Sequence, residues 1–378
     1  MGFSFALKQK DPTGARRGVL RTPHGAIETP VFMPVGTAAT VKGLTQEALE
    51  QLGASIILAN TYHLYLRPGH DLIRKLGGLH SFMSWGGAIL TDSGGYQVFS
   101  LADLRNITEE GVRFRSHLDG SEHLLTPEKA AEIQLALGSD IAMVLDECIA
   151  TPAPRKIAEV ALKRTTDWAR RARNYFLERA TRNGNPPQWQ FGIVQGATYA
   201  DLRRESARQL LELDFPGYAV GGLAVGEAHE VTCEMAAEVT ALLPATRPRY
   251  LMGVGRPEQL ADYVARGIDL MDCVLPTRAA RHACLYTSQG RVLIKNTRYI
   301  SDQRPIDPQC SCSVCRRYTR AYLRHLFAAG EISAAVLATH HNVHFYLDTM
   351  RQIREAISFG QLSNFASELR ARYAAGPA

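Results

Sequence analysis

The stretch QFGIVQGATYADLRRESARQLLELDFPGYAVGG, from Gln190 to Gly222, holds a complete strand–helix–strand unit. Apolar runs at Gln190–Val194 and Tyr218–Gly221 flank an amphipathic segment at Tyr199–Leu211. Short, continuous apolar runs are typical of strands buried on both faces, and a helix between two such strands leaves them parallel. The stretch therefore predicts an α/β fold built on a parallel sheet.

The same unit recurs along most of the chain. We expect eight strands, at Val31–Val35, Ser55–Ala59, Ala88–Thr91, Ile141–Leu145, Gln190–Val194, Tyr218–Gly221, Arg249–Gly253 and Asp269–Cys273. Helical patterns lie between most of them, at Thr45–Leu52, Pro127–Leu137, Arg155–Arg179, Tyr199–Leu211, His229–Leu242 and Pro257–Arg266. Eight repeats predict a (β/α)8 TIM barrel, and a doubly wound open sheet is the competing interpretation.

Two segments depart from this alternation. Arg17–Phe32 has the pattern of a hairpin that precedes the barrel. Val112–Leu125 alternates around Asp119-Gly120, which is a hairpin turn signal, so we expect it to extend the loop after the third strand.

The region after the eighth strand is rich in turns and contains three clustered cysteines. We expect a barrel with its hairpin over residues 1–275 and an inserted zinc-binding subdomain near the C-terminus over 276–342. A helical segment over 343–378, with a helix near Val343–Ile357, then closes the barrel.

Composition limits the class of protein. The 378 residues are 46% hydrophobic, and 43 Lys and Arg against 37 Asp and Glu give a net charge of +6. This mild excess permits a polyanionic partner without demanding one. The sequence has no apolar run of about 18–20 residues and no signal-like first segment, and its seven cysteines are an odd number. We expect a cytoplasmic protein with neither a membrane span nor a disulfide framework.

Polar or glycine residues stand at the ends of six predicted strands. They are Asp92, Asp146-Glu147, Gln195-Gly196, Gly221-Gly222, Gly253-Val254-Gly255 and Asp272. In a barrel these ends open onto one face, where the active sites of this fold lie. Turn formation alone also favours Asp and Gly at such places. Taken together, the set favours one shared pocket.

Three aspartates in one pocket suggest a division of roles. Cleavage of an N-glycosidic bond with retention needs an ionised carboxylate as nucleophile and a second group that transfers protons. A third carboxylate, or a glutamine carbonyl, can accept hydrogen bonds from a guanine. Glycine-rich turns let the backbone approach a planar base closely. The spacing leaves open which aspartate has which role.

The segment Gly253-Val254-Gly255-Arg256-Pro257 follows the seventh strand. Pro257 suits the first turn of a helix, and a helix N-terminus at this place in a barrel is a frequent phosphate site. A tight turn followed by a good helix start is the alternative interpretation.

Three cysteines, Cys310, Cys312 and Cys315, precede the pair His340-His341. Three thiolates and one imidazole fit tetrahedral zinc, and a filled shell of four protein ligands indicates a structural ion. The spacing leaves open which histidine binds.

Long segments of the chain resemble the tRNA-guanine transglycosylases of bacterial type, also called queuine tRNA-ribosyltransferases. The matching segments are TPVFMPVGT from Thr29, LANTYHLYLRPG from Leu58, LTDSGGYQVFSL from Leu90, FRSHLDGS from Phe114, DIAMVLDEC from Asp140, FGIVQG from Phe191, GGLAVGE from Gly221, LMGVG from Leu251, MDCVLPTR from Met271 and CSCSVCRRYTRAYLRHL from Cys310. The resemblance covers almost the whole chain.

This resemblance implies a TIM barrel with a zinc subdomain and a pentosyltransferase activity. The enzyme would replace the wobble guanine of tRNAs with GUN anticodons, those for Asp, Asn, His and Tyr, by 7-aminomethyl-7-deazaguanine, a step of queuosine biosynthesis. A covalent ribosyl-aspartate would form on the way. Guanine, the deazaguanine and tRNA are thus the implied partners, and a homodimer with one structural Zn²⁺ per subunit is implied.

The resemblance also assigns residues. Asp272 matches the nucleophile and Asp92 the general acid/base. The base would be held by Ser93, Gly94, Gly95, Tyr96, Asp146, Gln195, Gly222, Leu223 and Val225, with Tyr96 stacking on it. RNA would meet Gly253, Val254, Gly255, Arg256, Pro257, Glu258, Gln259, Thr277, Arg278, Ala279, Ala280 and Arg281. Cys310, Cys312, Cys315 and His341 match the metal ligands, His341 because it directly precedes Asn342.

Four positions depart from the usual family pattern. Ala279 replaces Asn, Ala283 and Ala197 replace Gly, and Arg256 replaces Thr. They leave details of RNA and base contact open, whereas both catalytic aspartates are present. The presence of both aspartates favours an enzyme over a non-catalytic RNA-binding subunit of the same fold. Two further hypotheses are a relative that acts on another tRNA position or on DNA, and a metal-assisted nucleoside hydrolase.

Overall fold

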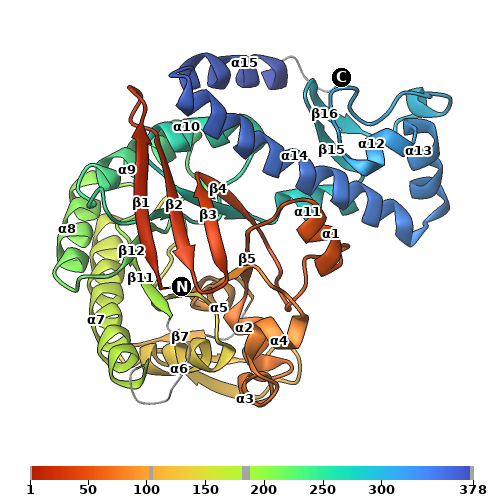
Figure 1. Ribbon diagram of the computed structural model, residues 1–378. Helices are drawn as coiled ribbons and strands as arrows, with labels where there is room; N and C mark the ends of the chain where they lie inside the picture. Colours follow the sequence, from red (N-terminus) through yellow and green to blue (C-terminus); the bar gives the residue numbers. More distant parts are fainter. Residues whose placement is uncertain (1, 102–104, 181–187, 375–378) are drawn as a thin grey trace.

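The structure is a computed structural model and describes residues 2–101, 105–180 and 188–374. Its centre is a parallel eight-stranded sheet in the order β4-β14-β13-β12-β11-β10-β6-β5. The two end strands meet through a parallel bridge between Val35 and Leu58, with a 2.6 Å hydrogen bond from Gly36 N–H to the Leu58 carbonyl. The sheet is therefore closed into a barrel (Figure 1), as expected, and the open-sheet interpretation is excluded.

All eight barrel strands lie close to their predicted positions. They are β4 (Val31–Pro34), β5 (Ile56–Ala59), β6 (Ala88–Thr91), β10 (Ile141–Met143), β11 (Trp189–Val194), β12 (Gly217–Val220), β13 (Arg249–Leu251) and β14 (Leu270–Cys273). Nearly every residue in them is buried, because one face fills the barrel and the other meets the surrounding helices. Strand ends shorten by one or two residues where the chain turns into the polar loops.

The covering helices also follow the predicted pattern. They are α1 (Gln46–Gln51), α6 (Pro127–Leu137), α7 (Arg155–Ala180), α8 (Ala200–Leu211), α9 (His229–Thr240) and α10 (Leu260–Ala265). Thr126 caps α6 by accepting a hydrogen bond from Lys129 N–H, and Gly138 ends it in the left-handed conformation. Three further short helices lie between β5 and β6: α2 (Thr61–Leu66), α3 (His70–Lys75) and α4 (Gly78–Met83).

A separate antiparallel sheet covers the end of the barrel where the strands begin. It comprises β1 (Ser4–Lys10), β2 (Arg16–Thr22) and β3 (Gly25–Thr29). The expected hairpin corresponds to β2 and β3, and β1 is an additional strand. Arg16 forms an ion pair with Asp269, just before β14, and Phe3 stacks on Trp189 at the start of β11. These contacts close the amino-terminal end, opposite the strand ends that carry the polar residues.

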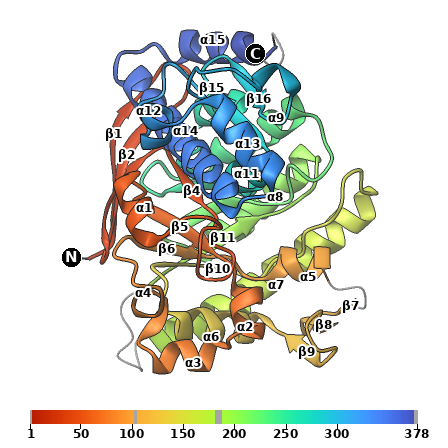
Figure 2. The ribbon, with the colours of Figure 1, turned by 90° about the vertical axis from the view of Figure 1, so that its right-hand side faces the viewer.

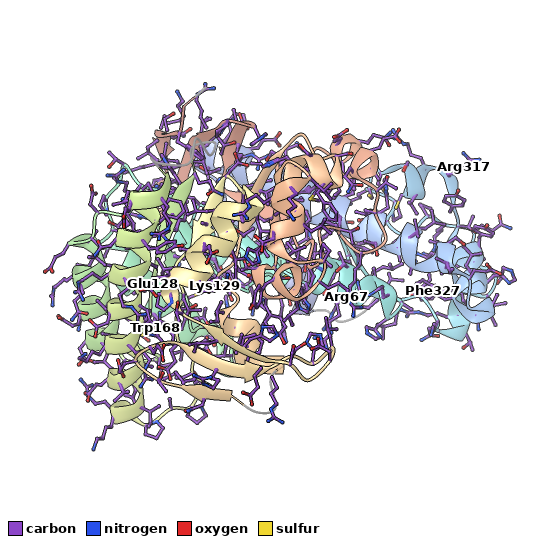
Figure 3. The ribbon with its side chains drawn as sticks, turned by 90° about the horizontal axis from the view of Figure 1, so that it is seen from below. Arg67, Glu128, Lys129, Trp168, Arg317 and Phe327 are labelled. Carbon is purple, nitrogen blue, oxygen red and sulfur yellow. The ribbon has the colours of Figure 1, made fainter. Side chains whose placement is uncertain are left out.

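The second segment that departs from the strand–helix alternation forms a small antiparallel sheet, which follows β6 and α5 (Gly95–Leu101) in the chain. Strands β7 (Arg105–Ile107), β8 (Val112–Arg115) and β9 (Glu122–Leu125) form it, with the predicted turn between β8 and β9. Figure 2 shows it on the side of the barrel opposite β1 and β2. Trp168 of α7, labelled in Figure 3, is fully buried and donates its indole N–H to the Glu109 carbonyl in the β7–β8 turn.

The subdomain projects from one side of the barrel (Figure 1). After α11 (Leu275–Arg281) it contains β15 (Cys284–Thr287), β16 (Gly290–Leu293), α12 (Ser313–Arg317) and α13 (Arg320–Ala329), around an apolar core of its own. In Figure 3, Arg317 and Phe327 lie on this projecting part, away from the barrel.

Helix α14 (Ile332–Ser358) connects the subdomain to the barrel, and α15 (Leu362–Ala374) follows it. The expected closing helix near Val343–Ile357 thus begins earlier, at Ile332, because no helix-breaking residue interrupts the pattern. Within the described part of the chain, no helix is both long enough and apolar enough to cross a membrane.

Candidate active site and metal site

The structure brings the three candidate aspartates to the carboxyl ends of the barrel strands. Asp92 directly follows β6, Asp146 follows β10, and Asp272 lies within β14. All three are at least nine-tenths buried. Gln195 and Gly222 follow β11 and β12 and join them. The predicted convergence of strand-end residues is thus observed.

Asp272 has one oxygen held and one oxygen open. Its Oδ1 accepts hydrogen bonds from the Tyr250 hydroxyl at 2.5 Å and from Gly253 N–H at 2.9 Å. No described residue donates to its Oδ2, which is not fully buried. Burial raises the pKa of Asp272, and the bonds from Tyr250 and Gly253 oppose that rise. The fixed carboxylate therefore presents one free oxygen, which is the arrangement that a nucleophile needs.

Tyr250 is a functional candidate that the sequence reasoning missed. Burial raises its pKa well above the ordinary value, and the neighbouring Asp272 carboxylate raises it further. The phenol therefore keeps its proton and remains a donor to Asp272. The available signal was its place in a barrel strand, two positions before the strand-end loop, with its side chain inside the barrel.

Asp92 has both oxygens occupied. Oδ1 accepts from Thr61 N–H at 2.9 Å and from Gly94 N–H at 3.2 Å. Oδ2 accepts from the side-chain amide of Gln97 at 2.7 Å and from that of Asn60. Burial raises the pKa of Asp92 to about 6, although these donors lower it. A carboxyl group with a pKa close to neutrality suits proton transfer in both directions. Asn60 and Gln97 were not predicted, because a single polar residue before or within a helix carries no local signal.

Asp146 and Gln195 form a second polar pair. Gln195 Nε2 donates to Asp146 Oδ2 at 2.7 Å, and the Ser93 hydroxyl donates to Oδ1 at 3.3 Å. Burial raises the pKa of Asp146 to about 6. A carboxyl, an amide oxygen and nearby backbone groups supply the acceptors and donors that match the edge of a guanine.

Glycines create the space around this pair. A Cβ on Gly222 would collide with Gln195 Oε1, and a Cβ on Gly95 would lie 2.7 Å from the Asp146 carbonyl oxygen. Gly222 also has a φ of +61, which favours glycine. The expected close approach of backbone to a planar ligand is therefore available here.

The remaining base-site candidates surround these groups. Tyr96, in the first turn of α5, is half exposed, and Leu223 is buried. The loop that holds Leu223 and Val225 is fixed by Glu227, which accepts from Val225 N–H at 3.2 Å and also from Ala224 N–H. A small hollow beside Asp146 is lined by residues that include Gly95, Cys148 and Trp168.

The candidate RNA-binding residues differ in exposure. Arg256, Arg278 and Arg281 are exposed, whereas Val254, Gly255, Pro257, Thr277 and Ala280 are buried. Pro257 begins a single 3-10 turn, η1 (Pro257–Gln259), which leads into α10. The loop after β13 therefore offers an exposed arginine and only a short helical start. Gly253 directs its N–H to Asp272, so part of this loop belongs to the surroundings of the carboxylate.

Two of the departures from the family pattern have positive φ. Ala197 has φ +49 and Ala283 has φ +61. For L-residues this conformation costs about 1–2 kcal/mol. The backbone geometry explains why glycine is common at both places, and alanine is accommodated here with some strain.

The potential metal ligands form one cluster. One ligand atom from each of Cys310, Cys312, Cys315 and His341 lies within 4.8 Å of the others. His341 Nδ1 is 3.7, 3.6 and 3.3 Å from the three sulfurs, in that order. Zinc bonds of normal length in a tetrahedron place sulfur and nitrogen about 3.5 Å apart. The donor set and its spacing therefore fit a tetrahedral ion.

The structure also distinguishes the two histidines. His341 is fully buried, and its Nε2 bonds to the Tyr286 carbonyl at 2.7 Å, which leaves Nδ1 for an ion. His340 instead contacts the Ser313 hydroxyl. His341 is therefore the histidine whose geometry fits, as the resemblance implied.

A second group of potential ligands lies at the opposite end of the barrel. His24 and His80 stack at 3.5 Å, and His24 Nδ1 lies 2.8 Å from Asp140 Oδ1. Asp140 also accepts from Ile89 N–H at 2.8 Å. We infer that this group links the β2–β3 turn, α4 and the start of β6.

Comparison with known proteins gives a consistent result. A family model described as queuine tRNA-ribosyltransferase matches residues 11–375. Proteins with that name are similar over nearly their full lengths. One from Koribacter versatilis is 56% identical, covering 96% of each chain, and one from Solibacter usitatus is 58% identical, also covering 96% of each. One from Pelotomaculum thermopropionicum is 55% identical over 99% of each chain.

Proposed function

The chain belongs to the queuine tRNA-ribosyltransferase family, and from this premise we propose how its residues divide the reaction. As a member it is a pentosyltransferase, a tRNA-guanine transglycosylase that exchanges guanine at the wobble position of tRNA in queuosine biosynthesis. The incoming base in our proposal is 7-aminomethyl-7-deazaguanine, and the exchange passes through a covalent ribosyl-aspartate.

Asp272 is the proposed nucleophile, and its free Oδ2 is the observation that carries this assignment. Tyr250 and Gly253 hold Oδ1, so Oδ2 is already oriented at the moment of reaction. Oδ2 attacks C1′ of the ribose, the bond from C1′ to N9 of guanine breaks, and its electron pair leaves with the base. The second half reverses these steps with the new base.

Asp92 is the proposed acid and base. A proton on its carboxyl group passes to the departing guanine, and the resulting carboxylate takes a proton from the incoming base. The pKa of about 6 supports both directions, because neither form of the group is rare near neutral pH. Asn60, Thr61, Gly94 and Gln97 stabilise the carboxylate form between the two transfers.

The proposed base site combines Asp146, Gln195, Gly222, Leu223 and Val225. Ser93, Gly94 and Gly95 shape its floor and Tyr96 stacks on the base. The burial of Asp146 and Gln195 supports this assignment, since buried polar groups reject a ligand that leaves them unpaired.

The partners of the protein follow from the same premise. We propose tRNAs with GUN anticodons, those for Asp, Asn, His and Tyr, as substrates. The exposed Arg256, Arg278 and Arg281 are the proposed contacts to phosphate, together with the rest of Gly253–Gln259 and Thr277–Arg281. We also propose a homodimer, and a cytoplasmic location because tRNA is there.

Zinc is the proposed ion of the Cys310, Cys312, Cys315 and His341 cluster. With four protein ligands its contribution would be structural, holding α12 against α14 in the subdomain. Residues 276–342 remain the proposed limits of this unit, with α14 shared between it and the barrel.

The test is exchange of radiolabelled guanine into a tRNA with a GUN anticodon, with and without the deazaguanine. Incorporation that the deazaguanine suppresses is the expected result. A chain that binds this tRNA but never exchanges guanine would be a non-catalytic RNA-binding subunit, and the proposal would fail.

A further inference from the structure

Arg203 of α8 is a fully buried cation that forms no salt bridge within the described part of the chain, although the Glu227 carboxylate lies near enough to raise its pKa. Its guanidinium donates to four backbone carbonyls. These are Ala197 at 2.7 Å, Gly221 at 2.9 Å, Gly222 at 3.1 Å and Val194 at 3.3 Å. The four carbonyls belong to the ends of β11 and β12 and the loops after them, which carry Gln195 and Gly222. One side chain therefore holds together two loops of the proposed base site.

These bonds determine where two backbone donors point. In a planar trans peptide, the carbonyl of one residue and the N–H of the next point in opposite directions. Since Arg203 holds the carbonyls of Gly221 and Gly222, the N–H groups of Gly222 and Leu223 point away from it. No described residue accepts from either N–H. Gly222 also packs directly against the Gln195 amide, which bonds Asp146, so these free donors lie at the polar pocket.

A guanidinium is well suited to this position, and other side chains are not. Its five N–H groups in a rigid plane can serve four carbonyls at once, whereas an ammonium offers three donors on a flexible stem. Burial lowers the pKa of Arg203 to about 10, so the group remains charged near neutral pH. The positive charge lies behind the two peptides and strengthens the positive ends of their dipoles on the pocket side.

We propose that Arg203 is a positioning residue that directs the Gly222 and Leu223 N–H groups at the 6-oxo group of the exchanged base. The inference rests on the proposed function, because it concerns recognition of that base. When the bond to C1′ breaks, negative charge spreads over the leaving purine to its 6-oxygen. Two aligned donors backed by a buried cation stabilise this charge. Arg203 would thereby favour both binding and departure of 6-oxopurines without touching them.

The test compares guanine with 2-aminopurine, which lacks the 6-oxo group. Binding of each base to the wild-type protein, to Arg203→Lys and to Arg203→Gln is measured by calorimetry, together with the KM for guanine and for tRNA. We expect guanine affinity to fall about 10- to 100-fold in both variants, while 2-aminopurine affinity changes little. The KM for guanine should rise, whereas the KM for tRNA, to which phosphate contacts contribute most, should change less.

Arg249→Lys is the matched control. Arg249 is also buried and donates to a carbonyl, that of Leu243, but at the amino-terminal end of the barrel. It should leave the ratio of guanine to 2-aminopurine affinity unchanged.

Each outcome separates the two proposals. A wild-type protein that neither binds nor exchanges guanine overturns the proposed function. If the wild type prefers guanine and the Arg203 variants keep the same ratio, or lose both bases equally, the role of Arg203 is overturned. Failure of both variants to fold, judged by thermal unfolding, would assign Arg203 to stability alone and also overturn it.

Discussion

Two aspartates at opposite ends of β14 differ in the groups that surround their carboxylates. Asp269, just before the strand, accepts from Arg16 Nε at 3.1 Å, from Arg16 Nη2 at 2.9 Å and from Arg249 N–H at 2.9 Å. Asp272, within the strand, has no cation partner among the described residues and keeps one oxygen free. Both carboxylates are buried, one just before the strand and one within it. The contrast teaches that a counterion neutralises the first carboxylate, whereas the second has none among the described residues and keeps the free oxygen that the proposed nucleophile needs.

The same contrast separates the two ends of the whole barrel. At the amino-terminal end, Asp140 lies between His24 and His80. At the carboxyl end, Asp92 and Asp146 accept from neutral amides, hydroxyls and N–H groups. Burial raises the pKa of Asp269 to about 6, as it does for Asp92 and Asp146, so the two ends differ in the partners of the carboxylates and not in that shift. Buried carboxylates without a counterion cost stability, and such groups cluster at functional sites.

The largest expected effect is on the reactive side. Asp272→Asn should reduce exchange by at least about 10⁴-fold, because it removes the attacking oxyanion while the fold is kept. The measurement is single-turnover exchange together with denaturing gel analysis of the tRNA adduct. Thermal unfolding should shift little, since Tyr250 and Gly253 can still donate to the amide oxygen. A covalent adduct in this variant would remove Asp272 from its role.

The proposed zinc site extends the comparison to thiolates, whose charge a metal ion would neutralise. Cys312→Ala should release about one zinc per chain and unfold the subdomain, because binding energy of a structural zinc contributes directly to folding. Metal analysis and proteolysis between α11 and α14 would report this. Cys284→Ala is the control. Cys284 lies outside the cluster, so this variant should retain the metal. Unchanged metal content in Cys312→Ala would contradict the ligand assignment.

Asp269→Asn tests the structural side. It leaves Arg16 buried and unpaired, so the free energy of unfolding should fall by about 3–5 kcal/mol, as measured by urea denaturation. Exchange per folded molecule should stay within about twofold, because the residue is remote from the pocket. The double variant Arg16→Met/Asp269→Leu should recover much of the stability. A loss of exchange without a loss of stability would break the contrast between Asp269 and Asp272.

The smallest effect is a change in pH dependence. Burial raises the pKa of Asp146 from 3.8 to about 6, so the folded state holds this proton more tightly. Its contribution is most favourable below pH 4 and is lost as pH rises to 6. Asp146→Asn should remove this negative slope, by up to about one proton or 1.4 kcal/mol per pH unit. Urea denaturation at several pH values between 4 and 7 measures it.

Asp302 is a control of opposite sign. Hydrogen bonding by Arg304 holds its pKa below the usual range, with Arg320 adding to the effect. Its contribution to stability is present at neutral pH and is lost as pH falls. Asp302→Asn should therefore change the low-pH slope in the opposite direction. If Asp146→Asn changed the pH dependence of the unfolding free energy in the same direction as Asp302→Asn, Asp146 would carry no raised pKa.

Much of the fold could be predicted because its signals are local. The runs Ala88–Thr91 and Gln190–Val194 have the composition of buried strands, and Thr126 with Pro127 marks a helix start. Strand β1 could not be predicted, because it alternates exposed and half-buried positions at the edge of a small sheet without an apolar run. The predicted start of α14 is too late, because His340 and His341 were assigned with the cysteines to the subdomain, which set its limit at residue 342.

The convergence of the three candidate aspartates at one end of the barrel could be predicted, but their hydrogen-bond partners could not. Asp92, Asp146 and Asp272 stood out because each ends an apolar run, and the family resemblance supplied their roles. Tyr250, Asn60 and Arg203 did not stand out. Each contacts a residue or loop that is distant in sequence, so nothing near it in the chain indicates that contact.

The sequence by itself determined the alternation of strands and helices, the three carboxylates at strand ends and the cysteine cluster. Each follows from residues close together in the chain, where periodicity and spacing are visible. Only the tertiary structure decided that Val35 meets Leu58 to close the barrel and that Asp269 meets Arg16 while Asp272 keeps a free oxygen. Hydrogen bonds between distant segments depend on how the closed sheet packs, and burial gives them their strength. That packing is why aspartates only three positions apart have such different partners.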